Sequence, residues 1–103
     1  MSVKDALIMK RADNVATVLQ DVEVGDVVIA KLGNEDFTVK ARGTIPFGFK
    51  VSIKSILKGE SILKYGEVIG KARTKIEEGV LVHIHNLEGT RGRGDLERRG
   101  SKS

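Results

Sequence analysis

The sequence has no cysteine and no tryptophan, a single proline, and only 4% aromatic residues among its 103 residues. Without cysteine, the chain can form neither a disulfide framework nor a thiolate metal site, and it has no cysteine nucleophile. It also has no long apolar run at its N-terminus, so we expect neither a signal peptide nor a membrane span, and a cytoplasmic location is the default expectation. This length corresponds to one domain with a modest core, which often relies on a partner.

The formal net charge of +4 raises the question of nucleic-acid binding. Residues 91–103 contain five basic and two acidic residues, so most of the excess positive charge lies near the C-terminus. The rest of the chain is near neutral, as on an ordinary solvated surface, and offers few aromatic residues to stack on bases. A small basic nucleic-acid-binding β-domain is therefore the weaker alternative, and nucleic acid is not expected as a partner.

The apolar residues are mostly Val, Ile and Leu, which favour strands, and the 12 glycines supply the turns. A turn containing glycine and followed by a strand recurs around Gly25, Gly59 and Gly79, while Pro46 and Gly48 indicate a shaped loop. We find no convincing long helix. The patterns predict an all-β, compact domain from about residue 6 to residue 87, with strands at 6–9, 15–19, 27–31, 37–41, 51–54, 61–63 and a glycine-interrupted one at 65–72.

Both histidines lie in the stretch 81–87, where alternate residues would share a face if the stretch is a strand. His83 and His85 would then point the same way, about 7 Å apart. Two imidazoles on one face are a credible start to a metal or acid–base site, although two ligands rarely hold a metal. The alternative is that one histidine lies on the surface and the other is half-buried.

Residues 88–103 show no hydrophobic periodicity and are polar, glycine-rich and charged. Such a composition cannot bury enough apolar surface to fold alone, so it predicts a flexible C-terminal tail, ordered only when bound. The predicted division is a domain at 1–87 and a tail at 88–103. The Arg-Gly-Asp tripeptide at 93–95 is interpreted as a coincidence.

Four motifs in order resemble a known family: Ile-Pro-Phe-Gly-Phe-Lys-Val at 45–51, Ile-Leu-Lys-Tyr-Gly-Glu-Val-Ile-Gly at 62–70, Val-His-Ile-His-Asn-Leu at 82–87 and Arg-Gly-Arg-Gly-Asp at 91–95. Together they resemble the N-terminal domain of the altronate and galactarate dehydratases (the UxaA-like family) and the small subunit of sulfolactate sulfo-lyase. The resemblance implies a SAF-type domain with a β-clip fold. It further implies the elimination of water from sugar acids, or of sulfite from a sulfonated hydroxy acid, with a divalent metal (iron or manganese) in the assembled enzyme.

In many members of that family this module is fused to a much larger domain, which would begin about where the motif at 91–95 lies. The resemblance therefore implies a separately encoded small subunit that is inactive alone and works with a large catalytic subunit on a sugar-acid substrate. A stand-alone SAF binding module without a catalytic partner is the alternative. The sequence leaves the substrate, the metal and the oligomeric state open.

β-Elimination requires a base for the α-proton, stabilisation of the enolate-like carboxylate and an acid for the leaving group. For catalysis the candidates are His83, His85 and Lys50, and the two histidines are also the candidate metal ligands. Lys50 could meet the substrate carboxylate as a point charge. The candidate substrate-binding residues are Tyr65, Asn86, Arg91 and Arg93, of which the two arginines can also form paired bonds to carboxylates of the large subunit.

Each assignment has a plainer alternative. Lys50 could be a solvated strand lysine, Tyr65 a packing aromatic beside a glycine turn, and Asn86 a residue that ends a strand. One departure from the family concerns Phe49, because the family usually has Gly-His-Lys where this chain has Gly-Phe-Lys at 48–50. The missing histidine implies either a different substrate or a histidine that is not essential.

Overall fold

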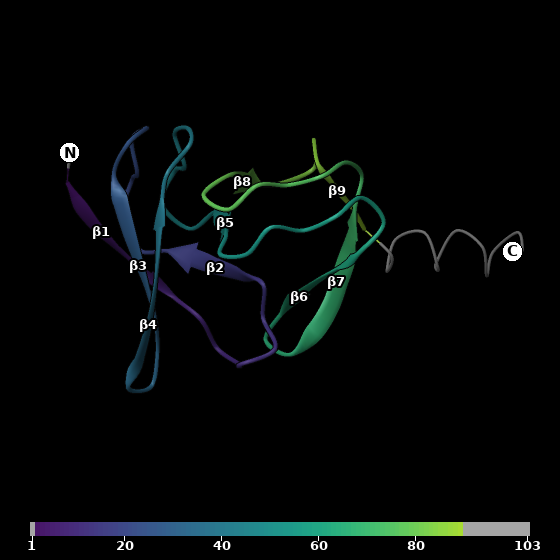
Figure 1. Cartoon of the computed structure of the whole chain (residues 1–103), viewed down its shortest axis with the longest axis horizontal. Helices are drawn as coiled ribbons and strands as arrows, with labels where there is room; N and C mark the ends of the chain where they lie inside the picture. The colour runs from purple at the N-terminus through teal and green to yellow at the C-terminus, as the bar shows by residue number, and fades with distance from the viewer. Residues whose placement is uncertain (1, 90–103) are drawn as a thin grey trace, which may run out of the picture.

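The computed structural model describes residues 2–89, which contain nine β-strands and no helix (Figure 1). The all-β prediction is confirmed, and nothing within residues 2–89 forms a helix long and apolar enough to cross a membrane. The predicted tail, including Arg91 and Arg93, lies outside the described residues except for its first two positions. The strands are β1 (Val3–Leu7), β2 (Val15–Val18), β3 (Val27–Leu32), β4 (Glu35–Lys40), β5 (Lys50–Ser52), β6 (Ser61–Lys64), β7 (Glu67–Ala72), β8 (Leu81–Val82) and β9 (Leu87–Glu88).

The strands form two sheets, which occupy opposite halves of the molecule in Figure 1. The larger sheet has the order β4-β3-β1-β2-β5-β8, and the smaller has the order β6-β7-β9. The pairing of β1 with β2 and of β3 with β4 is antiparallel, whereas β1 lies parallel to β3. The parallel pairing explains why β1 begins at Val3, earlier than predicted, because Val3 is already opposite Val27.

Strands β2, β5 and β8 separate two hydrophobic cores. Ala16, Val18 and Val51 belong to the first core, whereas Val15 and Val82 belong to the second, which also contains buried residues of the smaller sheet. Alternate residues of a strand face opposite sides of a sheet, so this division assigns each side chain of the three strands to one side. This assignment determines which candidate site residues can lie on the same side of the larger sheet.

Four glycine-containing turns have the same geometry, and each directly precedes a strand. The sequence predicted three such turns. In each, a fully buried aliphatic residue stands three positions before a glycine whose φ lies between 86° and 90°. Isolated bridges join the turns in two pairs, Val22 with Ile45 and Ile56 with Ile76. The fourth turn, at Gly48, is the loop that Pro46 marked in the sequence. The repeated turns fix the ends of the strands that carry the candidate residues.

The prediction of one strand from 81 to 87 is wrong, because β8 ends at Val82 and residues 83–86 form a turn. The cause is Asn86, which is 4% exposed. Its Oδ1 accepts a hydrogen bond from the His83 N–H (2.9 Å), and its Nδ2 donates one to the Leu81 carbonyl (2.8 Å). Asn side chains compete with the backbone ladder in this way and favour turns. Strand β9 then extends to Glu88, which pairs with Lys71 one residue past the predicted domain boundary.

Candidate functional site

Lys50 is the first residue of β5 and lies between two strands. Its register partners are Thr17 on β2 and Val82 on β8. Paired residues of neighbouring strands share a face, so Lys50 is on the side of the sheet where Val82 packs into the second core. Lys50 therefore points toward the smaller sheet, at the edge of the space between the two sheets.

The electrostatic environment of Lys50 is unusual for a strand lysine. Burial lowers the pKa of Lys50, and the positive charge of Lys64 lowers the pKa further. Lys64 is the last residue of β6, so a residue from each sheet contributes a positive charge to the same region. Loss of solvent and a neighbouring positive charge both disfavour the protonated form of a lysine.

Tyr65 directly follows Lys64 at the end of β6, and their side chains are in contact. Lys64 Nζ is 4.9 Å from the centroid of the Tyr65 ring, within the range of a cation–π contact. Both residues, with Glu67 and Ile69, line a hollow of about 330 Å³. Ile69 packs against the second core, so the hollow has one apolar lining residue beside three polar ones. We call these four lining residues, together with Lys50, which is on the side of the second core but does not line the hollow, the lysine cleft.

His83 lies on the other side of the larger sheet. The β5–β8 register pairs Lys50 with Val82, and its next step places Phe49 opposite His83. Their rings are in contact, with centroids 4.8 Å apart and planes tilted by 58°, and Phe49 packs against the first core. The structure therefore does not bring His83 and Lys50 onto one face, because His83 contacts a residue of the first core whereas Lys50 is paired with Val82 of the second.

His83, His85 and Asn86, in the turn at residues 83–86, differ in their exposure and contacts. His83 is half-buried and His85 is exposed, and the strand that would have given them a common face is absent. The carboxamide of Asn86 is occupied by the two backbone bonds that hold the turn. The structure thus shows Asn86 as the residue that shapes the turn, while its predicted contact with substrate stays a prediction.

The donors in residues 2–89 do not by themselves fit the predicted divalent metal. No three of the His, Asp and Glu side chains described there come together as a metal-binding group. His83 is packed on an aromatic ring and His85 faces solvent, so the two imidazoles lie in different surroundings. Iron or manganese in the assembled enzyme stays a prediction, and we derive no chemistry through it.

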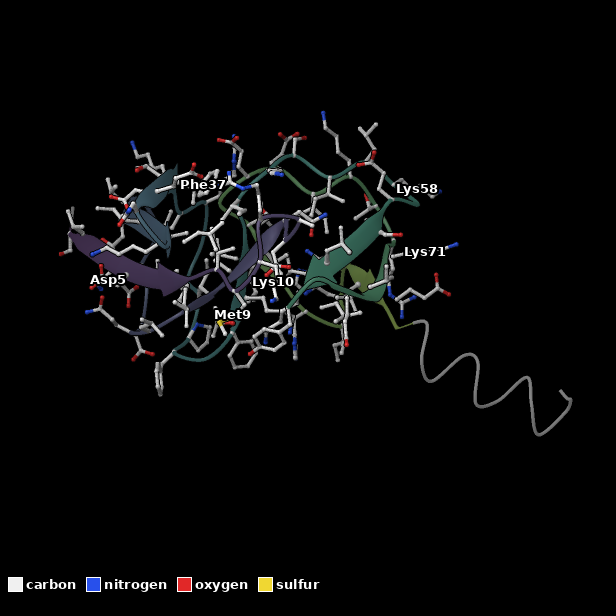
Figure 2. The ribbon with its side chains drawn as sticks, turned by 90° about the horizontal axis from the view of Figure 1, so that it is seen from below. Asp5, Met9, Lys10, Phe37, Lys58 and Lys71 are labelled. Atoms are coloured by element: carbon white, nitrogen blue, oxygen red, sulfur yellow. The ribbon has the colours of Figure 1, made fainter. Side chains whose placement is uncertain are left out.

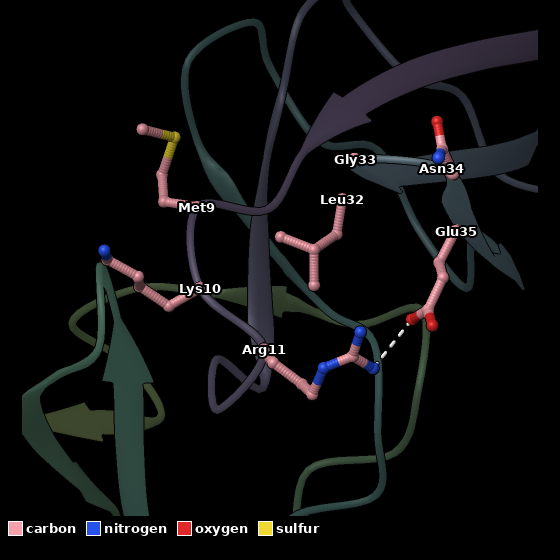
Figure 3. Close-up of a pocket in the computed structure, with 7 residues that line it drawn as sticks. All are labelled: Met9, Lys10, Arg11, Leu32, Gly33, Asn34 and Glu35. Carbon is pink, nitrogen blue, oxygen red and sulfur yellow. Dashed lines mark hydrogen bonds and ion pairs between the residues drawn. The ribbon is translucent and has the colours of Figure 1, made fainter.

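A larger hollow of about 470 Å³ lies between residues 9–11 and the turn that joins β3 to β4. Figure 3 shows the ion pair that spans it, from Arg11 Nη1 to Glu35 Oε1 at 2.8 Å. None of the residues predicted to form the site lines it. Figure 2 places Met9 and Lys10, which do line it, between the larger sheet and the β6–β7 hairpin.

Lys64 was missed by the sequence reasoning, although the signal was present. It lies next to Tyr65 inside the motif at 62–70, for which the sequence analysis proposes a role for the tyrosine alone. A lysine beside a glycine turn is common on solvated surfaces. Its relation to Lys50 depends on the packing of two sheets and could not be read from the local pattern.

Comparison of the sequence with known proteins identifies its family. Residues 4–90 match the family described as the altronate/galactarate dehydratase SAF domain. The (2R)-sulfolactate sulfo-lyase subunit alpha of Paracoccus pantotrophus is 42% identical over 55 residues, which cover 53% of this chain and 82% of that subunit. The same subunit of Chromohalobacter salexigens is 30% identical over 73 residues, covering 69% of this chain and 78% of the subunit.

The altronate dehydratase of Bacillus subtilis is 31% identical over 86 residues, which cover 84% of this chain but only 16% of that enzyme. The matched region is thus most of an alpha subunit and a small part of an altronate dehydratase. The family match covers almost all of the described residues, and the fold is all-β as the resemblance implied. The chain therefore belongs to the altronate/galactarate dehydratase SAF-domain family.

Proposed function

We propose that this chain is the small subunit of a lyase that removes water, or a related leaving group, from a sugar acid or another hydroxy acid. Two of the relatives are named as alpha subunits of a sulfo-lyase, and the matched region spans 82% and 78% of them. This supports a chain that assembles with a large catalytic subunit and is inactive alone. Altronate dehydratase activity is the first reaction to test, and sulfolactate is the second substrate class.

The observation that carries the proposal is the lysine cleft, where Lys64 lines the hollow and Lys50, from the other sheet, is on the side of the second core. Hydroxy acids and sulfonated acids are anions at neutral pH, and two ammonium groups attract a carboxylate or sulfonate strongly in a partly buried place. Tyr65, which also lines the hollow, can add a hydrogen-bonding hydroxyl. The described residues therefore offer a site for the acid group of the substrate.

Lys50 and Lys64 act as ammonium groups in the proposed site. Their positive charges would offset the charge that develops on the enolate-like carboxylate during elimination. Lys50 and Lys64 together can thus supply electrostatic stabilisation for the reaction.

The cleft is open and needs a second surface to exclude water. The hollow of about 330 Å³ falls near the lower end of the range for small-molecule pockets, and its lining residues Tyr65 and Glu67 are exposed to solvent. We propose that the large subunit closes over it. In this arrangement His83, which contacts Phe49 on the first core, the exposed His85, and Arg91 and Arg93, beyond the described residues, contribute only in the assembled enzyme.

The test is an NMR titration of the isolated chain with altronate and with sulfolactate. Both acids should shift the signals of Lys50, Lys64 and Tyr65, and Lys50→Met should weaken binding about tenfold or more, as expected for a lost charged hydrogen bond. Lys58→Met is the matched control, because Lys58 is an exposed lysine of a glycine turn beside the smaller sheet (Figure 2). Failure of both acids to shift the cleft, or an equal effect of the two substitutions, would contradict the proposed binding role.

The subunit role is tested by reconstitution with a candidate large subunit. The mixture should eliminate water or sulfite from one of the acids, whereas each chain alone should not. A chain that binds the acids but activates no large subunit would instead be the stand-alone binding module.

A further inference from the structure

Tyr65 has a backbone conformation that tyrosine rarely adopts. Its φ is +58°, and within residues 2–89 it is the single residue other than glycine with a positive φ. Tyr65 and Gly66 form the two-residue turn between the paired residues Lys64 and Glu67, and Gly66 has a φ of +74°. Two positive φ values define a type I′ hairpin turn, for which Asn-Gly is the preferred sequence. A tyrosine at the first position is therefore conformationally disfavoured.

The same chain makes a comparable hairpin without this strain. Leu32 and Glu35 are paired across the two-residue turn Gly33–Asn34, shown in Figure 3. There the positive φ of +60° falls on Gly33, which has no Cβ to oppose it. The unusual residue in the second hairpin thus calls for a reason other than hairpin formation, and strained residues cluster at functional sites.

The buried carboxylate of Asp13 holds the strained turn in place. Asp13 is 2% exposed, and its Oδ1 accepts a hydrogen bond from the Gly66 N–H at 2.7 Å. Its Oδ2 accepts from the Tyr65 N–H at 3.0 Å, and also from the N–H groups of Met9 (3.3 Å) and Lys10 (3.1 Å). Four donors from two distant segments thus meet on one side chain.

We propose that Asp13 is a positioning residue of the lysine cleft, which keeps Tyr65 in its left-handed conformation so that its ring supports Lys64. The chain of contacts runs from the Asp13 carboxylate to the Tyr65 N–H, and from the Tyr65 ring to Lys64 Nζ at 4.9 Å. Lys64 in turn acts on Lys50. The functional part of this inference rests on the proposed binding of acids at the cleft.

The first test needs no ligand. The ring current of Tyr65 should shift the ε-methylene protons of Lys64 upfield, and Asp13→Asn should abolish this shift and move Tyr65 out of positive φ, as measured by NMR couplings. Asp26→Asn is the matched control, because Asp26 is also a buried carboxylate that accepts backbone N–H groups, from Ser2 and Glu23. The inference is overturned if Asp13→Asn preserves the Lys64 shift and the φ of Tyr65.

Tyr65→Asn provides a variant that should fold even if Asp13→Asn does not. It creates the preferred Asn-Gly turn, so its melting temperature should rise by a few degrees while the Lys64 shift disappears. Tyr65→Phe keeps the ring and should keep the shift. A lower melting temperature for Tyr65→Asn would mean that the tyrosine is not strained, and the inference would fail.

The second test links Asp13 to acid binding through a double-mutant cycle with sulfolactate as the probe. Asp13→Asn and Tyr65→Asn should each weaken binding about two- to tenfold, and the double variant should be no weaker than Tyr65→Asn alone, because Asp13 acts through Tyr65. Losses that multiply would overturn the positioning role. If the unmodified chain binds no acid, the proposed function fails, and the Lys64 shift and the φ of Tyr65 still decide whether Asp13 holds the turn.

Discussion

Gly79 should tolerate a side chain far less well than the equivalent glycine of another turn. Gly79 and Gly59 have the same φ of +86°, but a Cβ on Gly59 would have open space around it, whereas a Cβ on Gly79 would overlap the carbonyl oxygen of Lys40. An alanine at either position pays a left-handed backbone cost of about 1–2 kcal/mol. At Gly79 the overlap with the backbone adds about 1–3 kcal/mol, as in an overpacked core.

These costs translate into melting temperatures. For a domain of 60–100 residues, 1 kcal/mol shifts the melting temperature by about 4–8 °C, so Gly59→Ala should lower it by about 4–16 °C. Gly79→Ala should lower it by at least about 4 °C more. Thermal unfolding followed by circular dichroism measures both variants, since the fold is all-β. Equal shifts would refute the reasoning, because the two glycines would then differ in nothing that matters for stability.

Two further predictions concern charge. Lys50→Met should raise the melting temperature near neutral pH, because the folded state lowers the pKa of Lys50 and so disfavours its protonated form. The difference in melting temperature between Lys50→Met and the unmodified protein should become smaller as pH rises through the folded-state pKa of Lys50 toward the ordinary lysine value of about 10.4. A difference that is constant with pH would contradict this. The pKa of Asp26 is lowered to about 2 by hydrogen bonds from the Glu23 and Ser2 N–H groups and by Lys4. Stability from Asp26 should therefore be present above pH of about 4 and be lost as pH falls toward 2, and Asp26→Asn should flatten the acid limb of a pH–stability curve.

The strands and turns could be predicted largely from the sequence because their signals are local. A buried aliphatic residue, two further residues and a glycine define each turn, and three of the four turns were recognised from the glycine and the strand that follows it. The turn at Gly48 was not counted with them, because Pro46 and Phe47 made it look like a different loop. The buried aliphatic residue of this turn is Ile45, and that of the turn at Gly25, which is bridged to it, is Val22.

The candidate site was harder to predict, because contacts between distant segments decide on which side of the sheet each candidate residue lies. Alternation in 81–87 is compatible with a strand, and only the bonds of Asn86 to His83 and Leu81 show that the chain turns instead. The face occupied by Lys50 follows from its pairing with Val82, which no local pattern contains. The resemblance to the family selects candidate segments, but it does not assign them to sides of a sheet.

The last prediction follows from that division into sides. Because Lys50 points toward the second core and His83 contacts Phe49 on the first, His83→Ala should leave sulfolactate binding by the isolated chain within about twofold, whereas Lys50→Met weakens it about tenfold or more. His85→Ala, at an exposed position of the same turn, is the control for a change of imidazole alone. In the reconstituted enzyme, His83→Ala should lower turnover more than it lowers subunit affinity.

A loss of acid binding in His83→Ala as large as in Lys50→Met would show that both side chains act on one bound acid and that the assignment to opposite faces is wrong. If instead the two effects separate, the geometry constrains the partner. Strand β8, which lies between the two side chains, is an edge strand of the larger sheet. A large subunit that uses both Lys50 and His83 would then have to enclose this edge and contact the sheet from both sides.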